Sequence, residues 1–472
     1  KDTLAWVHEE YRAYCRDRFQ DDGSYGESLQ YAGYTIFGLM LINETLRRAD
    51  PERFGSLDLE PYVHTVRWWA TALLYVKPLA GWGQHALPRS VNFNDSAAIF
   101  RPQADILMHI AARARDSHPT EAGLARWLHD QCYATAEALP HDRGTFGLVP
   151  DDNILSLVLL PQAAAAISPA TAGCDPLQAH EVGTVFARDA WNGQTILAVS
   201  GQDQQQRVQN HNHQDLNHFI LCHRGERLLV DPGHCCYRTP VYGLAKQSGS
   251  HNTCTIAGHE QVRRGGSRLL CERRSSVQAI AHDVGPAYPD PVREFSRLFL
   301  LCGSKALFIV DRIRADEAVD AFWHFVFNNR DGALEIAQLK PGRIVARRGD
   351  AGMKLVDGGE TRCQGPFYHH IHDAYHPLPA QNGEGQSGSG LMFKHSSGEK
   401  RREILRIHGI ALDSYGRIPR WHLDPHATGM LIHEKDGARW DLDIHSDPDA
   451  WRLRGPDTDL TITTNTAQWS IA

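Results

Sequence analysis

The chain changes its hydrophobic pattern near Pro161, and this change limits the folds open to it. Before Pro161, apolar residues recur at the three- and four-residue spacing of helices. After about Val182, short runs alternate apolar and polar residues between turn residues, as strands do. We therefore predict an α+β multidomain protein. Its expected parts are a helical domain over residues 1–168, an antiparallel β-sandwich over 176–380 and a C-terminal β-subdomain over 391–472.

The first part is expected to consist of amphipathic helices joined by short loops, with little strand signal. This pattern is typical of a helical solenoid or of an α/α toroid, which would be incomplete in this chain. Asn92–Ser96 has the composition of a helix N-terminus, so Asp95 or Ser96 is expected to cap the helix that follows. The expected helices cover residues 3–19, Glu27–Leu46, Glu60–Tyr75, Ser96–Ala114, Thr120–Leu139 and Asp152–Ile167.

The rest of the chain reads as short strands bounded by turn residues, which favours antiparallel sheets. Gly383–Gly390 is rich in glycine and serine and is expected to be a surface loop. The expected strands are Val185–Arg188, Gln194–Ser200, Phe219–Cys222, Arg227–Val230, Thr253–Ile256, Arg297–Leu301, Ala306–Val310, Ala321–Phe327, Ile404–Ala411, Gly429–His433 and Leu460–Thr464.

Composition narrows the class of protein. A hydrophobic content of 42% and a charged content of 22% are ordinary for a soluble globular protein. The net charge of −7 argues against a general nucleic-acid binder, although a local basic cleft could hold an anionic substrate. No apolar run reaches the roughly 18 residues of a membrane span. The 10 cysteines include no C-x-x-C pair, and free thiols are expected.

The segment from Asn210 to Asn252 concentrates residues that bind metals. His211 and His213 stand two positions apart, so they would share one face of a strand. Asp231 and another histidine follow on what read as neighbouring strands, and imidazole with carboxylate suits zinc or a similar divalent ion. In a chain with 27 histidines, a His-x-His pair alone is more often structural. The added Asp-Pro-Gly and His-Asn segments make a metal site the favoured interpretation.

This order of motifs resembles the heparinase II/III-like polysaccharide lyases. That family carries a His-x-His stretch, a strand ending in Asp-x-Gly, a tyrosine, and His-Asn-Thr before a strand. The corresponding segments here are His211–Asp215, Asp231–Gly233, Tyr237 and His251–Thr253. The resemblance implies that His213, Asp231 and His251 bind a divalent metal, with zinc the expected ion. It also implies that His211 points into the substrate cleft.

The first part of the chain carries a second motif of this family. Its toroid has a similar Asp-Gly-to-Tyr segment, here Asp22–Tyr34, whose tyrosine is the catalytic acid. By register this acid is Tyr31, with Tyr34 as the runner-up. Glu27 stands four residues before Tyr31, so both would lie on one helical face. The alternative is that Tyr31 simply packs in a core or wall, as most helical aromatic residues do.

The resemblance implies β-elimination of a polysaccharide that contains uronic acid, either a glycosaminoglycan or alginate. Tyr31 would be the acid, and His211 would be the base or the group that neutralises the substrate carboxylate. Tyr237 would be a second residue of the cleft, either catalytic or holding the sugar. The metal would be mainly structural and would orient His211 through the neighbouring ligand. The expected substrate-binding residues are Glu27, Tyr34, Asn94, Asn210 and Arg238, with Asn210 and Asn252 as supporting hydrogen-bond partners of the site.

Three other functions stay open from the sequence. A uronyl C5-epimerase would use the same tyrosine and histidine, and a non-catalytic glycan-binding protein would need neither. A metallohydrolase has no His-Glu-x-x-His segment to support it. The family's toroid has an earlier Asn or His that contacts the uronate carboxylate, but only 30 residues precede Tyr31. We therefore expect either a shortened chain or another neutralising group. Lys1 is not an initiator Met, so any signal peptide would have been removed and cannot be read. A periplasmic or secreted location is expected.

Overall fold

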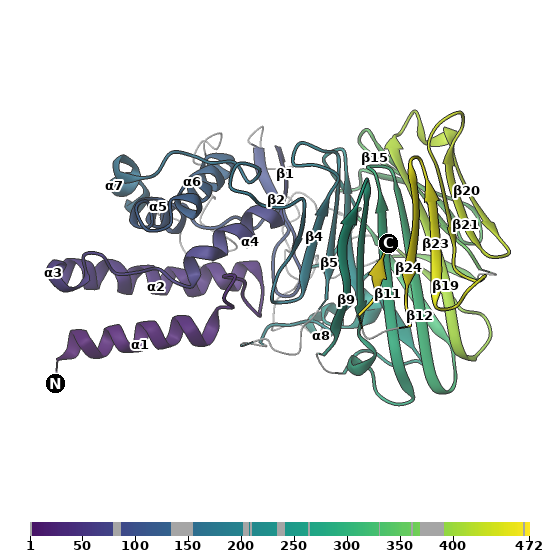
Figure 1. Cartoon of the computed structure of the whole chain (residues 1–472), viewed down its shortest axis with the longest axis horizontal. Coiled ribbons are helices and arrows are strands. Elements are labelled where there is room, and N and C mark those ends of the chain that lie inside the picture. The colour runs from purple at the N-terminus through teal and green to yellow at the C-terminus, as the bar shows by residue number, and fades with distance from the viewer. Residues whose placement is uncertain are drawn as a thin grey trace. The chain divides into compact units, whose positions relative to one another are not determined.

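The computed structural model of the chain forms two compact units. The first comprises Lys1–Val182 and Gln205–Asn212, and the second comprises Gly183–Gln204 and His213–Ala472. The chain thus leaves the first unit, returns to it for a few residues and leaves it again just after His211. The domain limits expected from the sequence stay predictions. The structure describes residues 2–78, 86–133, 154–201, 207, 210–233, 241–262, 265–329, 331–359, 362–368, 391–465 and 468–472 (Figure 1).

The first unit is mainly helical. Asp2 caps the first helix by accepting from two backbone N–H groups, and Ser28 caps the second by accepting from one, that of Tyr31. Its elements are α1 (Thr3–Arg18), α2 (Leu29–Ala49), α3 (Pro51–Phe54), η1 (Tyr62–His64), α4 (Thr65–Ala72), β1 (Leu73–Pro78), β2 (Ala86–Ser90), α5 (Ala104–Arg113), α6 (Pro119–Tyr133), α7 (Ile154–Leu159), η2 (Leu160–Gln162) and β3 (Leu177–Ala179).

Several expected helix limits are wrong. The helix expected over Glu60–Tyr75 ends at Ala72, and the chain continues as β1, which pairs antiparallel with β2. The helix expected from Ser96 starts only at Ala104, so neither Asp95 nor Ser96 caps it. The helix expected over Asp152–Ile167 ends in the short η2, because Pro161 lies there and Ala163 is extended. Residues 134–139, where another helix was expected to end, lie outside the described residues.

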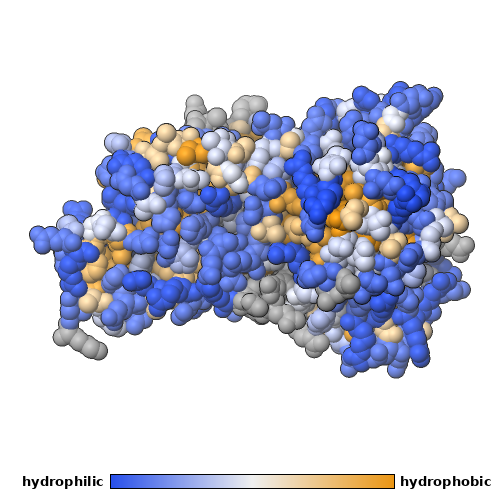
Figure 2. Space-filling view, in the orientation of Figure 1, coloured by the Kyte–Doolittle hydropathy of each residue, from blue (hydrophilic) through white to orange (hydrophobic). Residues whose placement is uncertain are grey.

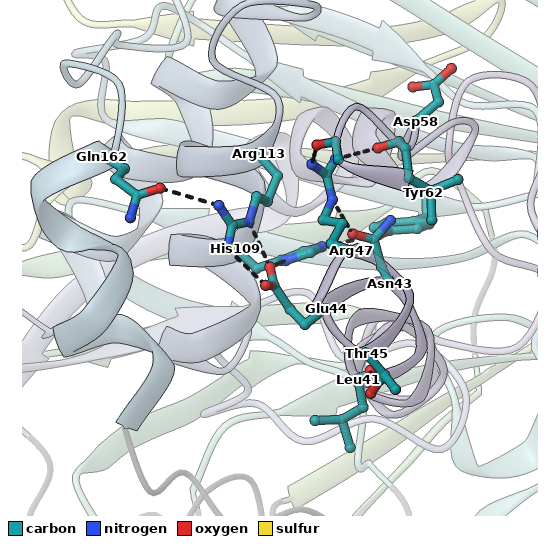
Figure 3. A network of polar contacts seen from close by, with 12 residues as sticks. Leu41, Asn43, Glu44, Thr45, Arg47, Asp58, Tyr62, His109, Arg113 and Gln162 are labelled. Carbon is teal, nitrogen blue, oxygen red and sulfur yellow. Dashed lines mark hydrogen bonds and ion pairs between the residues drawn. The ribbon is translucent and has the colours of Figure 1, made fainter. Parts of the chain in front are cut away.

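A buried polar network ties the helices of the first unit together (Figure 3). Glu44 on α2 accepts from Arg113 on α5 at 2.8 Å and lies 2.8 Å from Nδ1 of His109. Nε2 of His109 lies 3.1 Å from the hydroxyl of Tyr62, which in turn contacts the hydroxyl of Tyr11 on α1. Burial opposes ionisation of Glu44, but Arg113 and His109 outweigh it and lower the pKa of Glu44 to about 2. The network therefore joins α1, η1, α2 and α5 through one carboxylate.

The second unit consists of three antiparallel sheets. In one sheet the strand order is β17-β18-β13-β7-β6-β5-β4, with β8 pairing with β13. Its strands are β4 (Thr184–Arg188), β5 (Thr195–Ser200), β6 (His218–His223), β7 (Glu226–Leu229), β8 (Cys254–Ile256), β13 (Ala321–Phe327), β17 (Cys363–Tyr368) and β18 (Leu391–Ser396). The short helices α8 (Val241–Ala245) and η3 (Ser248–Ser250) lie between β7 and β8 in the chain.

The other two sheets share a hydrophobic core. One has the order β14-β15-β16-β19-β12-β11-β10-β9, and the last follows the chain from β20 to β25. Side chains such as Leu298 and Phe308 from the former pack with Met430 and Trp451 from the latter. The strands are β9 (Ser267–Arg274), β10 (Val277–Asp283), β11 (Val292–Cys302), β12 (Ala306–Val319), β14 (Leu334–Lys340), β15 (Arg343–Arg348), β16 (Ala351–Asp357), β19 (Arg401–Ser414), β20 (Trp421–His426), β21 (Gly429–Glu434), β22 (Arg439–Asp443), β23 (Ala450–Gly455), β24 (Thr458–Thr463) and β25 (Ser470–Ile471).

The coarse prediction of a helical part followed by antiparallel sheets is confirmed. Every strand segment expected from the alternating pattern overlaps a strand. The face drawn in Figure 2 is mostly hydrophilic, in keeping with the ordinary charged content of the chain. None of the described helices is long and apolar enough to cross a membrane. The eight cysteines among the described residues are free thiols, as expected.

Candidate functional site

Tyr31 and His211 lie against each other in the first unit. Tyr31 stands in the first turn of α2, where its backbone N–H donates to the Ser28 hydroxyl at 3.2 Å. The phenol and imidazole rings are stacked, with centroids 3.9 Å apart and planes inclined by 17°. Both side chains are half-buried. Two residues that are 180 positions apart in the sequence are therefore brought into ring contact, as the predicted acid and base would need to be.

Asp95 holds the imidazole of His211. Its Oδ2 lies 2.9 Å from Nδ1 of His211, and its backbone N–H donates to the His211 carbonyl at 3.2 Å. The Asp95 side chain is fully buried, and the Ser28 hydroxyl donates to its carbonyl at 3.1 Å. An ionised carboxylate only accepts, so Nδ1 carries the hydrogen and Nε2 keeps its lone pair. Sequence reasoning assigned Asp95 to a helix cap and missed this role.

Glu27, Asn94 and Asn210 lie beside this pair. The Asn94 amide donates to the Glu27 carbonyl at 2.7 Å, and the Asn210 side chain hydrogen-bonds the Glu27 carboxyl. Burial raises the pKa of Glu27, although His211 opposes the shift. The expectation that Glu27 and Tyr31 share a helical face is wrong, because Ser28 caps α2 and leaves Glu27 outside the helix. Tyr34 is 54% exposed on α2.

The predicted metal ligands are brought together in the second unit. Nδ1 of His213 lies 3.3 Å from Nε2 of His251, which lies 3.7 Å from Oδ2 of Asp231. All three side chains are fully buried. Asp215 and His218, which were not predicted as ligands, are buried in the same cluster. Ligand atoms of Asp215, Asp231 and His251 all lie within 4.8 Å of one another, close enough to meet at one ion.

The local structure of this cluster differs from the expectation. The stretch with His211 and His213 is not a strand; His211 has a left-handed backbone with φ of 57°, and β6 starts only at His218. Asp231 follows the end of β7, and His251 follows η3. The residues of the cluster therefore come from segments that follow the ends of strands and short helices.

Hydrogen bonds fix the tautomers of two histidines in this cluster. Nδ1 of His251 lies 2.8 Å from the Gln247 carbonyl, so Nδ1 carries the hydrogen and the Nε2 lone pair faces Asp231. Nδ1 of His218 accepts from the Asn252 backbone N–H at 2.8 Å, so its Nε2–H faces Oδ2 of Asp231 at 3.2 Å. His251 is thus arranged as a ligand and His218 as a donor that orients Asp231.

The protonation states also fit a metal. Burial lowers the pKa of His251 to about 4, which keeps the imidazole neutral at neutral pH. Burial opposes ionisation of Asp231, but the nearby histidines outweigh it and lower its pKa to about 2. Neutral imidazole and ionised carboxylate are the forms that bind zinc. The residues present therefore fit a divalent ion. The side-chain amide of Asn252 supports them by donating hydrogen bonds to the Phe219 and Val230 carbonyls.

Two predicted site residues, Tyr237 and Arg238, lie outside the described residues. Their expected roles stay predictions. The structure thus assembles two separate groups, Tyr31 with His211 in the first unit and Asp231 with His251 in the second.

A known protein family matches the segment that contains His213, Asp231 and His251. Residues 175–382 match the family described as "Heparinase II/III-like, C-terminal". The resemblance seen in the sequence motifs is therefore confirmed, and the matched segment includes all the predicted metal ligands and both predicted catalytic residues beyond Tyr31. No curated protein sequence is similar enough to count as a match.

Solved structures of heparinases share the fold. The heparan sulfate lyase HepC from Pedobacter heparinus aligns with 100% of this chain and 62% of its own length, at 12% identity and a TM-score of 0.63. A structure of heparinase III aligns with 98% of this chain and 63% of its own length, at 13% identity and a TM-score of 0.64. The chain thus spans a little under two thirds of these proteins. At such identities the likeness concerns the fold, a mixed α and β architecture with antiparallel sheets.

Proposed function

We propose that this chain is a polysaccharide lyase that cleaves a uronic acid-containing glycosaminoglycan by β-elimination. The observation that carries the proposal is the stacking of Tyr31 on His211, with the buried Asp95 at Nδ1 of the imidazole. The heparinase II/III-like family of residues 175–382 supports it. Because solved neighbours are a heparan sulfate lyase and heparinase III, heparan sulfate is the first polymer to test.

β-Elimination needs a base, an acid and a group that neutralises the substrate carboxylate. Nε2 of His211, which keeps its lone pair, would take the proton from C5 of the uronate. The Tyr31 hydroxyl would give a proton to the O4 leaving group as the C4–O bond breaks. Each positioned proton-transfer group typically contributes about 10²- to 10⁴-fold to the rate. The carboxylate at Nδ1 stabilises the imidazolium that forms on His211.

Amide groups near His211 would neutralise the uronate carboxylate. Asn94 and Asn210 both lie at Glu27, next to the stacked pair, and amide donors suit this task in a site from which water is excluded. Glu27, whose pKa is raised by burial, could donate a hydrogen bond when protonated. Tyr34 would contact the sugar from the exposed side of α2. Tyr237 and Arg238 keep their proposed roles as catalytic and substrate-binding residues.

His213, Asp231 and His251 would hold a divalent metal, for which zinc suits the ligand set, and Asp215 lies close enough to Asp231 and His251 to join them. When bound, the ion would supply a structural cross-link among residues at the ends of strands. Because His213 follows His211 by two positions, an ordered His213 restrains the backbone that carries the base. We further propose that the helices are part of an α/α toroid, that the sheets stack as a β-sandwich, and that the protein is periplasmic or secreted.

Ultraviolet absorbance tests the proposed function. Metal-replete protein is incubated with heparan sulfate, chondroitin sulfate, dermatan sulfate, hyaluronan and alginate in turn. β-Elimination leaves a conjugated C4=C5 double bond that absorbs, whereas hydrolysis and epimerisation do not. A rise on one polymer is expected. A flat trace on all five would overturn the lyase proposal, and solvent deuterium entering C5 would then identify an epimerase.

A further inference from the structure

A second group of histidines and a carboxylate is buried in the second unit, away from the family motifs. Asp357 ends β16, His395 lies on β18 and His408 lies on β19. The two histidines are 0% exposed and Asp357 is 5% exposed. One ligand atom of each residue lies within 4.8 Å of those of the other two. The group therefore has the ligand types, number and spacing of a metal site.

The ring nitrogens of these histidines lack hydrogen-bond partners. Among the described residues, neither nitrogen of His395 and neither nitrogen of His408 is hydrogen-bonded. The nearest carboxylate atom, Oδ2 of Asp357, lies 3.5 Å from Nδ1 of His395 and 3.7 Å from Nε2 of His408. Buried polar atoms in native proteins nearly always have a partner, so such a set calls for a bound ion or water. An ion beside Oδ2 of Asp357 would use one nitrogen from each ring.

The surroundings hold these side chains in place. The two imidazoles are stacked with centroids 5.4 Å apart, and Phe325 packs against both. Arg406 donates from Nη2 to Oδ2 of Asp357 at 2.8 Å, and its Nε lies 2.7 Å from Oδ1 of the same carboxylate. Hydrogen bonds of this kind fix ligating carboxylates in metal sites. Aromatic walls and a fixed carboxylate leave the ring nitrogens facing one small volume.

Arg406 also adds a positive charge beside the carboxylate, which weakens the attraction for a cation. The ion would therefore depend on two imidazole nitrogens and one carboxylate oxygen as its ligands.

We propose that Asp357, His395 and His408 bind a divalent metal ion, with zinc as the best-suited ion. This site shares no ligand with the Asp231 and His251 cluster. His395 belongs to one sheet and His408 to another, so the ion would cross-link two sheets inside the second unit. Because the site is buried, the ion would enter during folding and would be part of the folding free energy.

A third group, Glu60, His64 and His118, does not support a metal site in the same way. It is partly exposed, and its Glu60 and His118 already contact each other at 3.0 Å. An exposed histidine–carboxylate pair needs no ion to satisfy it. Of these two groups, only the buried Asp357 group therefore needs a ligand to complete its chemistry.

Anomalous diffraction tests the proposal on the unaltered protein. The full chain is produced in zinc-supplemented medium, crystallised without chelator, and measured above and below the zinc absorption edge. The expected result is an anomalous peak among Asp357, His395 and His408 that disappears below the edge. A map with a zinc peak at the Asp231 cluster and none at Asp357 would overturn the proposal.

Metal content gives an independent test in solution. Zinc per chain is measured after desalting for the wild type, His395→Asn, His408→Asn and the surface control His433→Asn. The first two variants are expected to lose one equivalent relative to the wild type, and the control, which is stacked on the exposed His422, is expected to lose none. Retention of the full zinc content in folded His395→Asn and His408→Asn would contradict the proposal. If these variants do not fold, the crystallographic result decides.

Discussion

The imidazole of His211 stacks on the phenol of Tyr31 at a centroid distance of 3.9 Å, although Tyr31 lies on α2 and His211 lies in the short return segment of the first unit. This contact places a proton acceptor and a proton donor next to each other. The hydroxyl of Tyr31 is not needed to stack the rings. The chemistry of the pair can therefore be removed without removing the packing.

Replacing Tyr31 by Phe should strongly reduce turnover and leave the fold intact. The change removes only the hydroxyl, so the ring contact with His211 remains while the proton donor for O4 is lost. We expect kcat to fall by about 10²- to 10⁴-fold, with little change in thermal unfolding. Absorbance on the preferred polymer measures the rate, and Tyr14→Phe, on the exposed side of α1, is the matched control. A Tyr31→Phe enzyme with a near-normal rate would exclude Tyr31 as the acid.

Replacing Asp95 by Asn should lower kcat more than it raises KM. The amide keeps the size of the side chain but cannot hold the imidazole as a buried carboxylate does, and its NH₂ group can turn Nδ1 into an acceptor. His211 would then carry its hydrogen on Nε2, where the substrate proton must go. We expect a fall of at least about 10²-fold in kcat. An unchanged kcat would mean that Asp95 serves only the turn in which it lies.

Much of the second unit could be predicted from sequence, because long buried strands give apolar runs that stand out between turn residues. Strands β11, β12 and β13 were all located by this signal. Strand β14 was missed, since most of its residues are exposed or half-buried and its apolar alternation is weak. In the first unit, the mainly apolar sequence after Trp68 and Trp69 continues into Leu73. The sequence therefore carries no signal for the change from α4 to β1.

The candidate site divides in the same way. His213, Asp231 and His251 could be found because they fall in one stretch with a recognisable order of motifs. Asp95 could not, because its partner His211 lies 116 residues away and its local context reads as an ordinary cap. His218 was overlooked because it starts an apolar strand, and only the hydrogen bond from Asn252 shows that its other nitrogen faces Asp231.

The Glu44 network predicts a specific acid sensitivity of the helical unit (Figure 3). The pKa of Glu44 is lowered from 4.5 to about 2, so its ionised form stabilises the fold above pH 4.5. This contribution, about 3 kcal/mol at most, is lost as the pH falls from 4.5 toward 2. Glu44→Gln should therefore lower the thermal midpoint at pH 7 and flatten its decline in that acid range. Glu52→Gln on α3 is the exposed control, and identical pH profiles for Glu44→Gln and wild type would refute the assignment.

Removing a ligand of the Asp231 cluster should separate metal binding from catalysis. His251→Ala deletes the imidazole whose Nε2 lone pair faces Asp231, so we expect loss of one metal equivalent and a lower thermal midpoint together. His211→Ala should keep the metal but lose activity, because His211 contacts Asp95 and Tyr31 in the first unit. Metal content by mass spectrometry, thermal unfolding and absorbance on the same preparations distinguish the two outcomes. If His211→Ala loses the metal while His251→Ala retains it, the roles proposed for the two histidines are exchanged.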